Sequence, residues 1–171
     1  MSNSTERLVD PVLEGGLASL ESARGITMQL IEVIAPDQML TRGCAGGNHT
    51  AYVLGHIAWT EDMFLSSLSG RSPALPQAWG ERFGMKMELS DDPSHYPEKE
   101  ALVRAMVERR SAMVEWLGSL SAEALSAPIE GDLAAFVPNR GALAGLLTFH
   151  ESFHAGQVSV CRRAIGLPHL F

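Results

Sequence analysis

The chain has 171 residues, of which 46% are hydrophobic and 6% aromatic, and its formal net charge at pH 7 is −7. That length suits a single domain over residues 1–171, and the apolar fraction excludes a disordered chain. The acidic balance argues against nucleic acid and membrane surfaces as partners, because both bind to a clustered basic face. The composition therefore predicts a globular domain whose partner is a small-molecule substrate.

Cysteine usage and the N-terminal residues indicate the compartment. Cys44 and Cys161 are too few for a disulfide framework, so a reducing environment is expected. The first seven residues lack the apolar core of a signal peptide, and no apolar run approaches the roughly 18 residues of a membrane span. We therefore expect a soluble, cytoplasmic protein.

Four segments carry the 3.6-residue periodicity of amphipathic helices, and no segment shows the two-residue alternation of strands. The predicted helices cover residues 9–35, 48–68, 97–120 and 139–165. Asn48 and Asn139 are the expected N-caps of the second and fourth helices. A short helical turn is expected near residues 121–125. Four long helices predict an all-α fold, a four-helix bundle.

The segment between the second and third predicted helices is rich in proline and glycine. We predict a long loop over residues 70–95, and loops of this length are often binding loops or lids. Trp79, Phe83 and Met85 lie in this loop. These three side chains are therefore expected to line or cover the opening of a site.

Histidines interrupt the apolar faces of two predicted helices. On a helical wheel, His150, His154 and Gln157 lie in the middle of the apolar face of the fourth helix. His56 lies at the centre of the apolar face of the second helix. A polar side chain in such a place costs about 1–3 kcal/mol unless a partner satisfies it. Two helices of one bundle therefore direct imidazoles toward a shared interior.

A bound divalent metal ion accounts for this pattern. His150 and His154 are one turn apart, about 6 Å along the helix axis, so both can bind one ion. His56 is the best third ligand because it lies in the middle of its helix. His49 is roughly 10.5 Å from His56 along the axis, too far to share the ion easily. Whether His49 or Gln157 contributes to the site stays open. Three histidines leave a position for water or substrate, as in catalytic metal sites.

The remaining histidines and cysteines have simpler interpretations. His95 and His169 are predicted to lie at the surface, and Cys161 is predicted to be a small core residue. Cys44 lies in a glycine-rich stretch, where it is expected to be exposed, and nothing near it in the sequence predicts a lowered pKa.

Residues 150–154 match the H-E-x-x-H pattern of zinc proteases, in which the glutamate is the general base. The surrounding sequence disfavours a protease. Gln157 and Val160 replace the glycine and third histidine of the metzincins, and no acidic residue follows His154.

Two segments carry a resemblance to a known family. Residues 48–59, followed by Glu61 and Asp62, resemble the second helix of DinB-like proteins. Residues 149–157 and 162–168 resemble the final helix of the same proteins. This family contains damage-inducible and thiol-transferase-like metalloproteins. The resemblance implies a four-helix bundle with one divalent metal ion on three histidines.

Carried over residue by residue, the family's ligands correspond to His56, His150 and His154 of this chain. Some members use a low-molecular-weight thiol such as mycothiol, bacillithiol or glutathione, so the resemblance adds such a thiol as a cofactor.

The sequence therefore predicts a metal-dependent enzyme of the thiol-dependent S-transferase or hydrolase type, with Zn²⁺ or Ni²⁺ at an open three-histidine site. The ion would polarise a bound water or lower the pKa of a substrate thiol. The alternative is a non-enzymatic, stress-related bundle that binds metal or a partner. No catalytic residue beyond the metal ligands is assigned.

A homodimer is a further expectation. The second predicted helix has another apolar edge opposite His56. A second copy of the chain would cover this edge, and packing against the bundle's own loops would also do so. The members of this edge are Ala51, Leu54, Ala58 and Leu65, and the edge is interrupted by Glu61 and Asp62.

Overall fold

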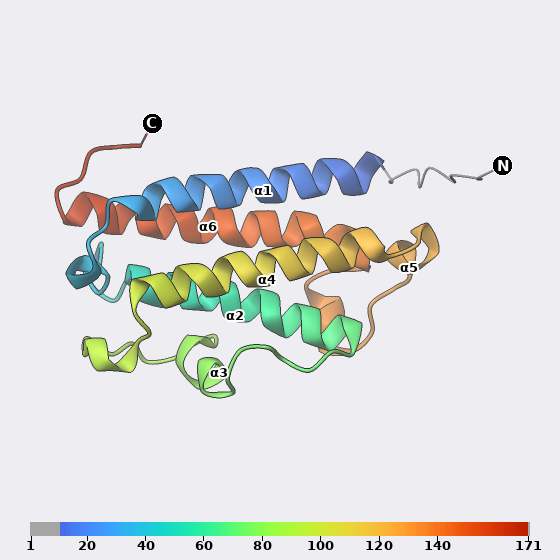
Figure 1. The fold of residues 1–171 in the computed structure, drawn as a ribbon, viewed down its shortest axis with the longest axis horizontal. Coiled ribbons are helices and arrows are strands. Elements are labelled where there is room, and N and C mark those ends of the chain that lie inside the picture. The colour runs from blue at the N-terminus through green and yellow to red at the C-terminus, as the bar shows by residue number, and fades with distance from the viewer. Residues whose placement is uncertain (1–10, 171) are drawn as a thin grey trace.

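The computed structural model describes residues 11–170, which form a bundle of four long α-helices (Figure 1). The long helices are α1 (Pro11–Glu32), α2 (Thr50–Ser69), α4 (Lys99–Ser119) and α6 (Leu143–Ala164). Two short helices, α3 (Ala78–Phe83) and α5 (Ala122–Ser126), lie in the connections, together with 3-10 turns at Pro36–Gln38, Pro93–His95, Gly131–Ala135 and Arg140–Ala142. No strand occurs within residues 11–170, so the predicted all-α fold is confirmed. The predicted helix start at residue 9 lies outside the described residues.

The long helices pack as two parallel pairs (Figure 1). Near the start of α1, a Cβ at Gly16 would lie 3.1 Å from the Cβ of Ala144 in α6. Near their other ends, Arg162 Nη1 donates a hydrogen bond to the carbonyl oxygen of Leu30 at 2.7 Å. α2 and α4 run together in the opposite direction. Because α2 and α4 are parallel, the chain must return along the bundle between them, which explains the length of that connection.

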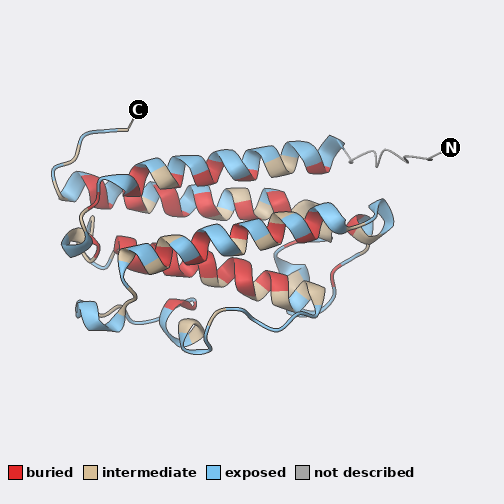
Figure 2. Cartoon of the chain, in the orientation of Figure 1, coloured by how far each residue is buried: buried red, intermediate tan, exposed pale blue. Residues whose placement is uncertain are grey.

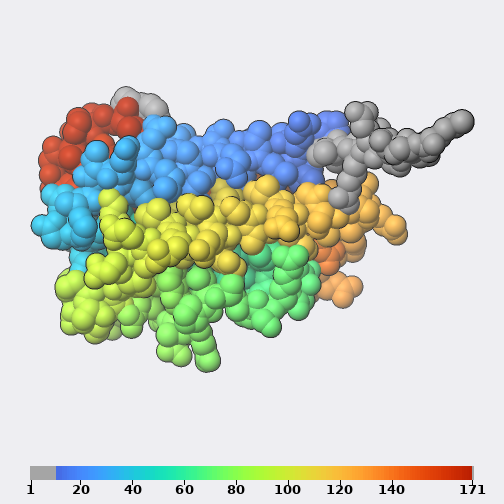
Figure 3. All heavy atoms as spheres, in the orientation of Figure 1, coloured from blue at the N-terminus to red at the C-terminus, as the bar shows by residue number. Residues whose placement is uncertain are grey.

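The connection between α2 and α4 is more ordered than the predicted loop. It contains α3 and a 3-10 turn, and it covers one edge of the molecule (Figure 3). Asp62 secures its beginning, because its carboxylate accepts hydrogen bonds from the backbone N–H groups of Ala74 and Leu75. Phe83 is fully buried in the core, so the prediction that it covers an opening was wrong. Met85 is exposed and Trp79 is half-buried.

The start of α2 differs from the prediction by one residue. His49 is the N-cap in place of Asn48, and its Nδ1 accepts a hydrogen bond from the backbone N–H of Tyr52 at 3.1 Å. Histidine is not among the preferred N-cap residues, so residue preference alone favoured the neighbouring asparagine. Asn139 caps the 3-10 turn Arg140–Ala142 that leads into α6, since its Oδ1 accepts from the N–H of Ala142 at 2.9 Å, whereas Ala142 stands at the N-cap of α6 itself.

Two apolar clusters form the core, and each draws side chains from all four long helices. Buried positions recur along each of these helices (Figure 2). The first cluster includes Leu30, Ile57, Met106 and Val158, and the second includes Leu20, Phe64, Met113 and Leu147. Between the two clusters, one buried charged residue from each long helix joins a shared network of ion pairs. These four residues are Arg24, Glu61, Arg110 and Glu151.

The four buried charges pair across the bundle. Arg24 donates to Glu151 Oε1 at 2.7 Å and to Glu61 Oε1 at 3.1 Å. Arg110 donates to both carboxylates and to the carbonyl oxygen of Leu20. Two positive and two negative groups leave no net buried charge, so pairing offsets much of the cost of desolvation. This buried charge layer connects the four helices at mid-length.

The second apolar edge of α2 is covered within the chain itself. Ala51, Leu54, Ala58 and Leu65 are each less than 5% exposed and belong to core clusters that contain residues of α4. This edge is therefore not free to bind a second copy, and the homodimer stays a prediction. No helix in residues 11–170 combines the length and apolarity needed to cross a membrane.

Candidate metal centre

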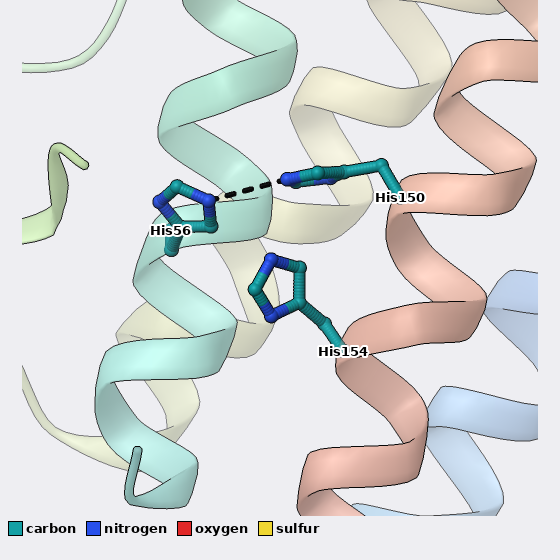
Figure 4. A group of neighbouring side chains, drawn as sticks. All are labelled: His56, His150 and His154. Atoms are coloured by element: carbon teal, nitrogen blue, oxygen red, sulfur yellow. Dashed lines mark hydrogen bonds between the residues drawn. The ribbon is translucent and has the colours of Figure 1, made fainter. Parts of the chain in front are cut away.

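The three predicted ligands converge between α2 and α6 (Figure 4). His56 extends from α2, and His150 and His154 extend from successive turns of α6. One nitrogen of each ring lies within 4.8 Å of the corresponding nitrogen of the other two. His56 and His154 are buried, and His150 is half-buried. Within residues 11–170, this is the one group of histidine, cysteine and acidic side chains with ligand atoms so close together.

The spacing of the rings fits coordination of one ion. The Nε2 atoms of His56 and His150 are 3.2 Å apart. Two nitrogens bound to one tetrahedral ion at about 2.0–2.1 Å would lie about 3.3 Å apart. The ring centroid of His154 is 4.8 Å from that of His56 and 4.6 Å from that of His150. All three imidazoles therefore fit on one side of a single divalent cation.

Hydrogen bonds from outside the triad orient two of its rings. The Nδ1 of His56 lies 2.6 Å from the carbonyl oxygen of Phe83, and the Nδ1 of His154 lies 2.9 Å from Gln157 Oε1. Both oxygens can only accept, so both Nδ1 atoms carry the proton and donate it. The Nε2 atoms of His56 and His154 then carry no proton, so each has a lone pair that a metal ion can bind, an arrangement typical of metal-binding histidines. The lone pair of His56 faces Nε2 of His150.

Gln157, whose contribution the sequence left open, contacts the triad through His154. Its Oε1 also accepts a hydrogen bond from Asn48 Nδ2 at 3.1 Å, and this second donor fixes the orientation of the amide. Asn48 in turn is held by α6, because the Cys161 thiol donates to the Asn48 carbonyl oxygen at 3.3 Å. The residues just before α2 thus support a ligand on α6.

Burial keeps the triad uncharged at neutral pH. Burial, together with the neighbouring His154 and His56, lowers the pKa of His150 to about 3. Burial likewise lowers the pKa of His154 to about 4, against the hydrogen bond to Gln157. The pKa of His56 is also lowered by burial. Because metal ions bind the neutral imidazole, the triad is ready to bind without first losing protons.

Glu151 has no part in the site, although it follows His150 directly. Both of its carboxylate oxygens are bonded to arginines, Oε1 to Arg24 and Oε2 to Arg110. In a zinc protease this glutamate must face the metal-bound water. The H-E-x-x-H pattern is therefore formed here by two ligands and one member of the buried charge layer.

The other histidines lie outside the triad. His49 is fully buried, caps α2, and packs edge-on against the ring of Tyr96 with centroids 4.7 Å apart. Burial lowers its pKa to about 4. His95 and His169 are exposed as predicted. The cysteines also match the prediction, since Cys161 is buried and Cys44 is exposed.

A cavity of about 110 Å³ opens beside the triad, with His56 and His150 in its wall. Met85 lines it, as predicted for the segment after α2. Thr60 and Phe136 also line it, and the sequence pattern had not singled them out. Thr60 lies one helical turn beyond His56. Its place on the same helix face could therefore have indicated from the sequence that it lines the site.

Comparison with known proteins places the chain in a family. A sequence model of the DinB superfamily matches residues 19–158. No curated protein matches the chain significantly.

Two solved structures share the fold. A conserved protein from Enterococcus faecalis is 19% identical, with a TM-score of 0.69, over 90% of this chain and 96% of that one. YfiT from Bacillus subtilis is 18% identical, with a TM-score of 0.65, over 98% of this chain and 95% of that one. YfiT is described as a probable metal-dependent hydrolase with an unusual four-helix bundle topology. With the family's sequence pattern covering most of its length and the fold shared with these structures, the chain belongs to the DinB superfamily.

Proposed function

We propose that this protein is a metal-dependent enzyme acting on a small molecule, with one divalent cation held by His56, His150 and His154. The observation that carries the proposal is the convergence of three neutral imidazoles with ligand atoms within 4.8 Å of one another. No fourth protein ligand joins them in the described part of the chain, so a position stays free for water or substrate. The description of YfiT as a probable metal-dependent hydrolase supports the same assignment.

The reaction is of the hydrolase or thiol S-transferase type. A divalent cation bound there supplies a Lewis acid that lowers the pKa of a bound water or thiol at neutral pH. Zn²⁺ and Ni²⁺ both suit imidazole ligands. Phe83 and Gln157 hold two of the ligand rings, and the adjoining cavity offers room for a substrate group. A low-molecular-weight thiol is the proposed co-substrate of the transferase reaction.

Two free cysteines support a reducing, cytoplasmic location for this activity.

Metal content tests this function. Protein purified without chelators should contain about one Zn²⁺ or Ni²⁺ per chain by elemental analysis. Single replacements His56→Ala, His150→Ala and His154→Ala should each remove the ion while the helical fold persists. His95→Ala and His169→Ala are matched controls, because both residues are exposed and neither belongs to the triad.

The outcomes separate the alternatives. Loss of metal with little change in melting temperature supports an open functional site, whereas collapse of the fold indicates a structural metal. A metal-free protein whose melting temperature does not change with added Zn²⁺ or Ni²⁺ would contradict the proposal. Addition of a thiol to a screen of electrophilic substrates then distinguishes S-transfer from hydrolysis.

A further inference from the structure

The cavity beside the triad is lined mostly by apolar side chains. Besides His56 and His150, it is lined by side chains of α2 and α6 and by one residue from each of two connections. These side chains are Trp59, Thr60, Met63, Phe64, Met85, Phe136, Leu146 and Leu147. No lysine, arginine, aspartate or glutamate is among them. A charged group placed here would lose its hydration without gaining a partner, so the lining favours an uncharged occupant.

The size of the cavity limits what it can hold. Its volume is about 110 Å³, somewhat below the roughly 150 Å³ of an engineered apolar cavity that binds benzene. A compact group of about four or five carbon atoms fits that space. Three larger hollows, of about 140, 310 and 540 Å³, include none of the three histidines in their lining.

Thr60 is the one residue of this lining that carries a side-chain hydroxyl. Its side chain is nearly completely buried, and its Oγ1 has no hydrogen-bond partner within the described residues. Thr27 and Thr148, also in helices, donate to the carbonyl oxygen four residues earlier, but Thr60 does not. A buried hydroxyl without a partner costs about 1–3 kcal/mol. A polar atom of a bound molecule would remove that cost.

Two exposed apolar side chains lie at the opening of the cavity. Met85 is 61% exposed and follows α3, and Phe136 is 54% exposed and follows the 3-10 turn at Gly131–Ala135. Both line the cavity although they come from different connections. An occupant of the cavity would cover apolar surface on both side chains, and burial of apolar area is favourable.

We propose that this cavity is the specificity pocket of the site. It takes the compact, uncharged, apolar group of a substrate whose reacting atom lies at the three histidines, and the Thr60 hydroxyl is a polar contact for that group. This inference rests on the proposed function for the position of the reacting atom, and it adds the class of substrate.

Hydroxamates are suitable probes, because their head group binds open metal sites and their side chain can be varied. We would measure by calorimetry the affinity of Zn²⁺-loaded full-length protein for acetohydroxamate, isovalerohydroxamate and a carboxylate-terminated analogue of the same length. Isovalerohydroxamate should bind about tenfold tighter than acetohydroxamate or better, because it buries three more carbon atoms. The carboxylate analogue should bind more weakly than acetohydroxamate.

Variants of the lining make the test specific. Leu146→Trp fills the cavity, so it should abolish the advantage of isovalerohydroxamate while acetohydroxamate still binds. Thr60→Val should weaken binding of 3-hydroxyisovalerohydroxamate about tenfold and leave isovalerohydroxamate unchanged or tighter. Thr60→Ser, which keeps the hydroxyl, should retain binding of the hydroxylated probe.

A metal-free titration separates the two proposals. Isovaleramide added to metal-free protein should shift the methyl NMR signals of Met63 and Met85, which line the cavity. If acetohydroxamate fails to bind loaded protein, the open metal site is wrong. If acetohydroxamate binds but isovalerohydroxamate has no advantage, or if isovaleramide leaves both methyl signals in place, the specificity pocket is wrong.

Discussion

The Nδ1 of His56 lies 2.6 Å from the carbonyl oxygen of Phe83, which is 27 residues further along the chain. The ring of Phe83 is buried directly against Gly55, the residue before His56. Phe83 therefore fills the core with its side chain and orients a metal ligand with its backbone. The connection between α2 and α4 is in this way part of the candidate metal centre.

Gly55→Ala should disturb both functions of Phe83. A Cβ at Gly55 would lie 2.1 Å from a ring carbon of Phe83, so the ring must move and take its carbonyl with it. We expect a loss of about 1–3 kcal/mol of folding free energy from overpacking. We also expect metal affinity to fall about tenfold or more, because a supporting hydrogen bond of His56 is lost. Denaturant unfolding and metal titration measure the two effects.

Gly145→Ala is the matched control for that variant. Gly145 lies in α6, and a Cβ there would meet no atom within 4 Å. Alanine should therefore stabilise the helix by about 0.5–1 kcal/mol without changing metal affinity. Unchanged metal affinity in Gly55→Ala would show that the Phe83 carbonyl does not support His56.

Gln157→Ala should weaken metal binding without unfolding the protein. Gln157 is partly exposed and accepts the Nδ1 proton of His154, so its removal frees that ring to turn. Loss of such a supporting partner typically costs about 10–100-fold in metal affinity. Gln157→Glu retains an acceptor and should retain affinity. Equal affinities for all three proteins, measured with a competing chelator, would remove Gln157 from the site.

Glu151→Gln should reduce stability and leave the metal site intact. The substitution removes one negative charge from the buried layer and leaves Arg24 and Arg110 incompletely paired. Breaking a buried ion pair in this way costs about 3–5 kcal/mol. Glu108→Gln, at an exposed position of α4, is the neutral control. If Glu151 were a general base, Glu151→Gln would instead preserve stability and abolish activity.

The metal-free protein should lose stability as the pH falls below about 6.5, the ordinary pKa of histidine. Burial lowers the pKa of His49 to about 4, so this ring stays neutral in the folded state while the unfolded chain binds a proton. The unfolded state then binds more protons, and stability decreases as the pH is lowered from 6.5 toward 4. His150 and His154 act in the same direction.

His49→Asn isolates one part of this pH dependence. Asparagine can still cap α2 but does not titrate, so the slope of stability against pH should decrease by about 1.4 kcal/mol per pH unit between pH 6 and 5. Denaturant unfolding at pH 7, 6 and 5 measures the slope. The same slope in the variant and in the wild-type chain would contradict a buried neutral His49. His95→Asn, at an exposed position, should not change it.

Much of the fold and the three ligands could be predicted from the sequence. Helical periodicity is a local property, and it identified the four long helices. The ligands were identifiable because a histidine on an apolar face conflicts with its surroundings. His56, His150 and His154 each show that conflict.

The features that support the site could not be predicted in the same way. Phe83 contacts His56 through its backbone carbonyl group. Because every residue has such a group, the residue type at position 83 does not indicate this contact. Arg24 and Glu151 are 127 residues apart, and each alone resembles a solvent-facing charge. Their pairing depends on α1 and α6 packing side by side, which periodicity does not specify.

X-ray absorption spectroscopy of the protein loaded with one equivalent of Zn²⁺ or Ni²⁺ tests the metal centre most directly. The spectrum should show three imidazole nitrogens at about 2.0–2.1 Å and at least one further light scatterer from solvent. His150→Ala, which should lose the ion on purification, should show at most two imidazole nitrogens when the ion is added back. Sulfur ligands, fewer than three imidazoles in the unaltered protein, or an ion that binds equally well without His150 would contradict the three-histidine centre.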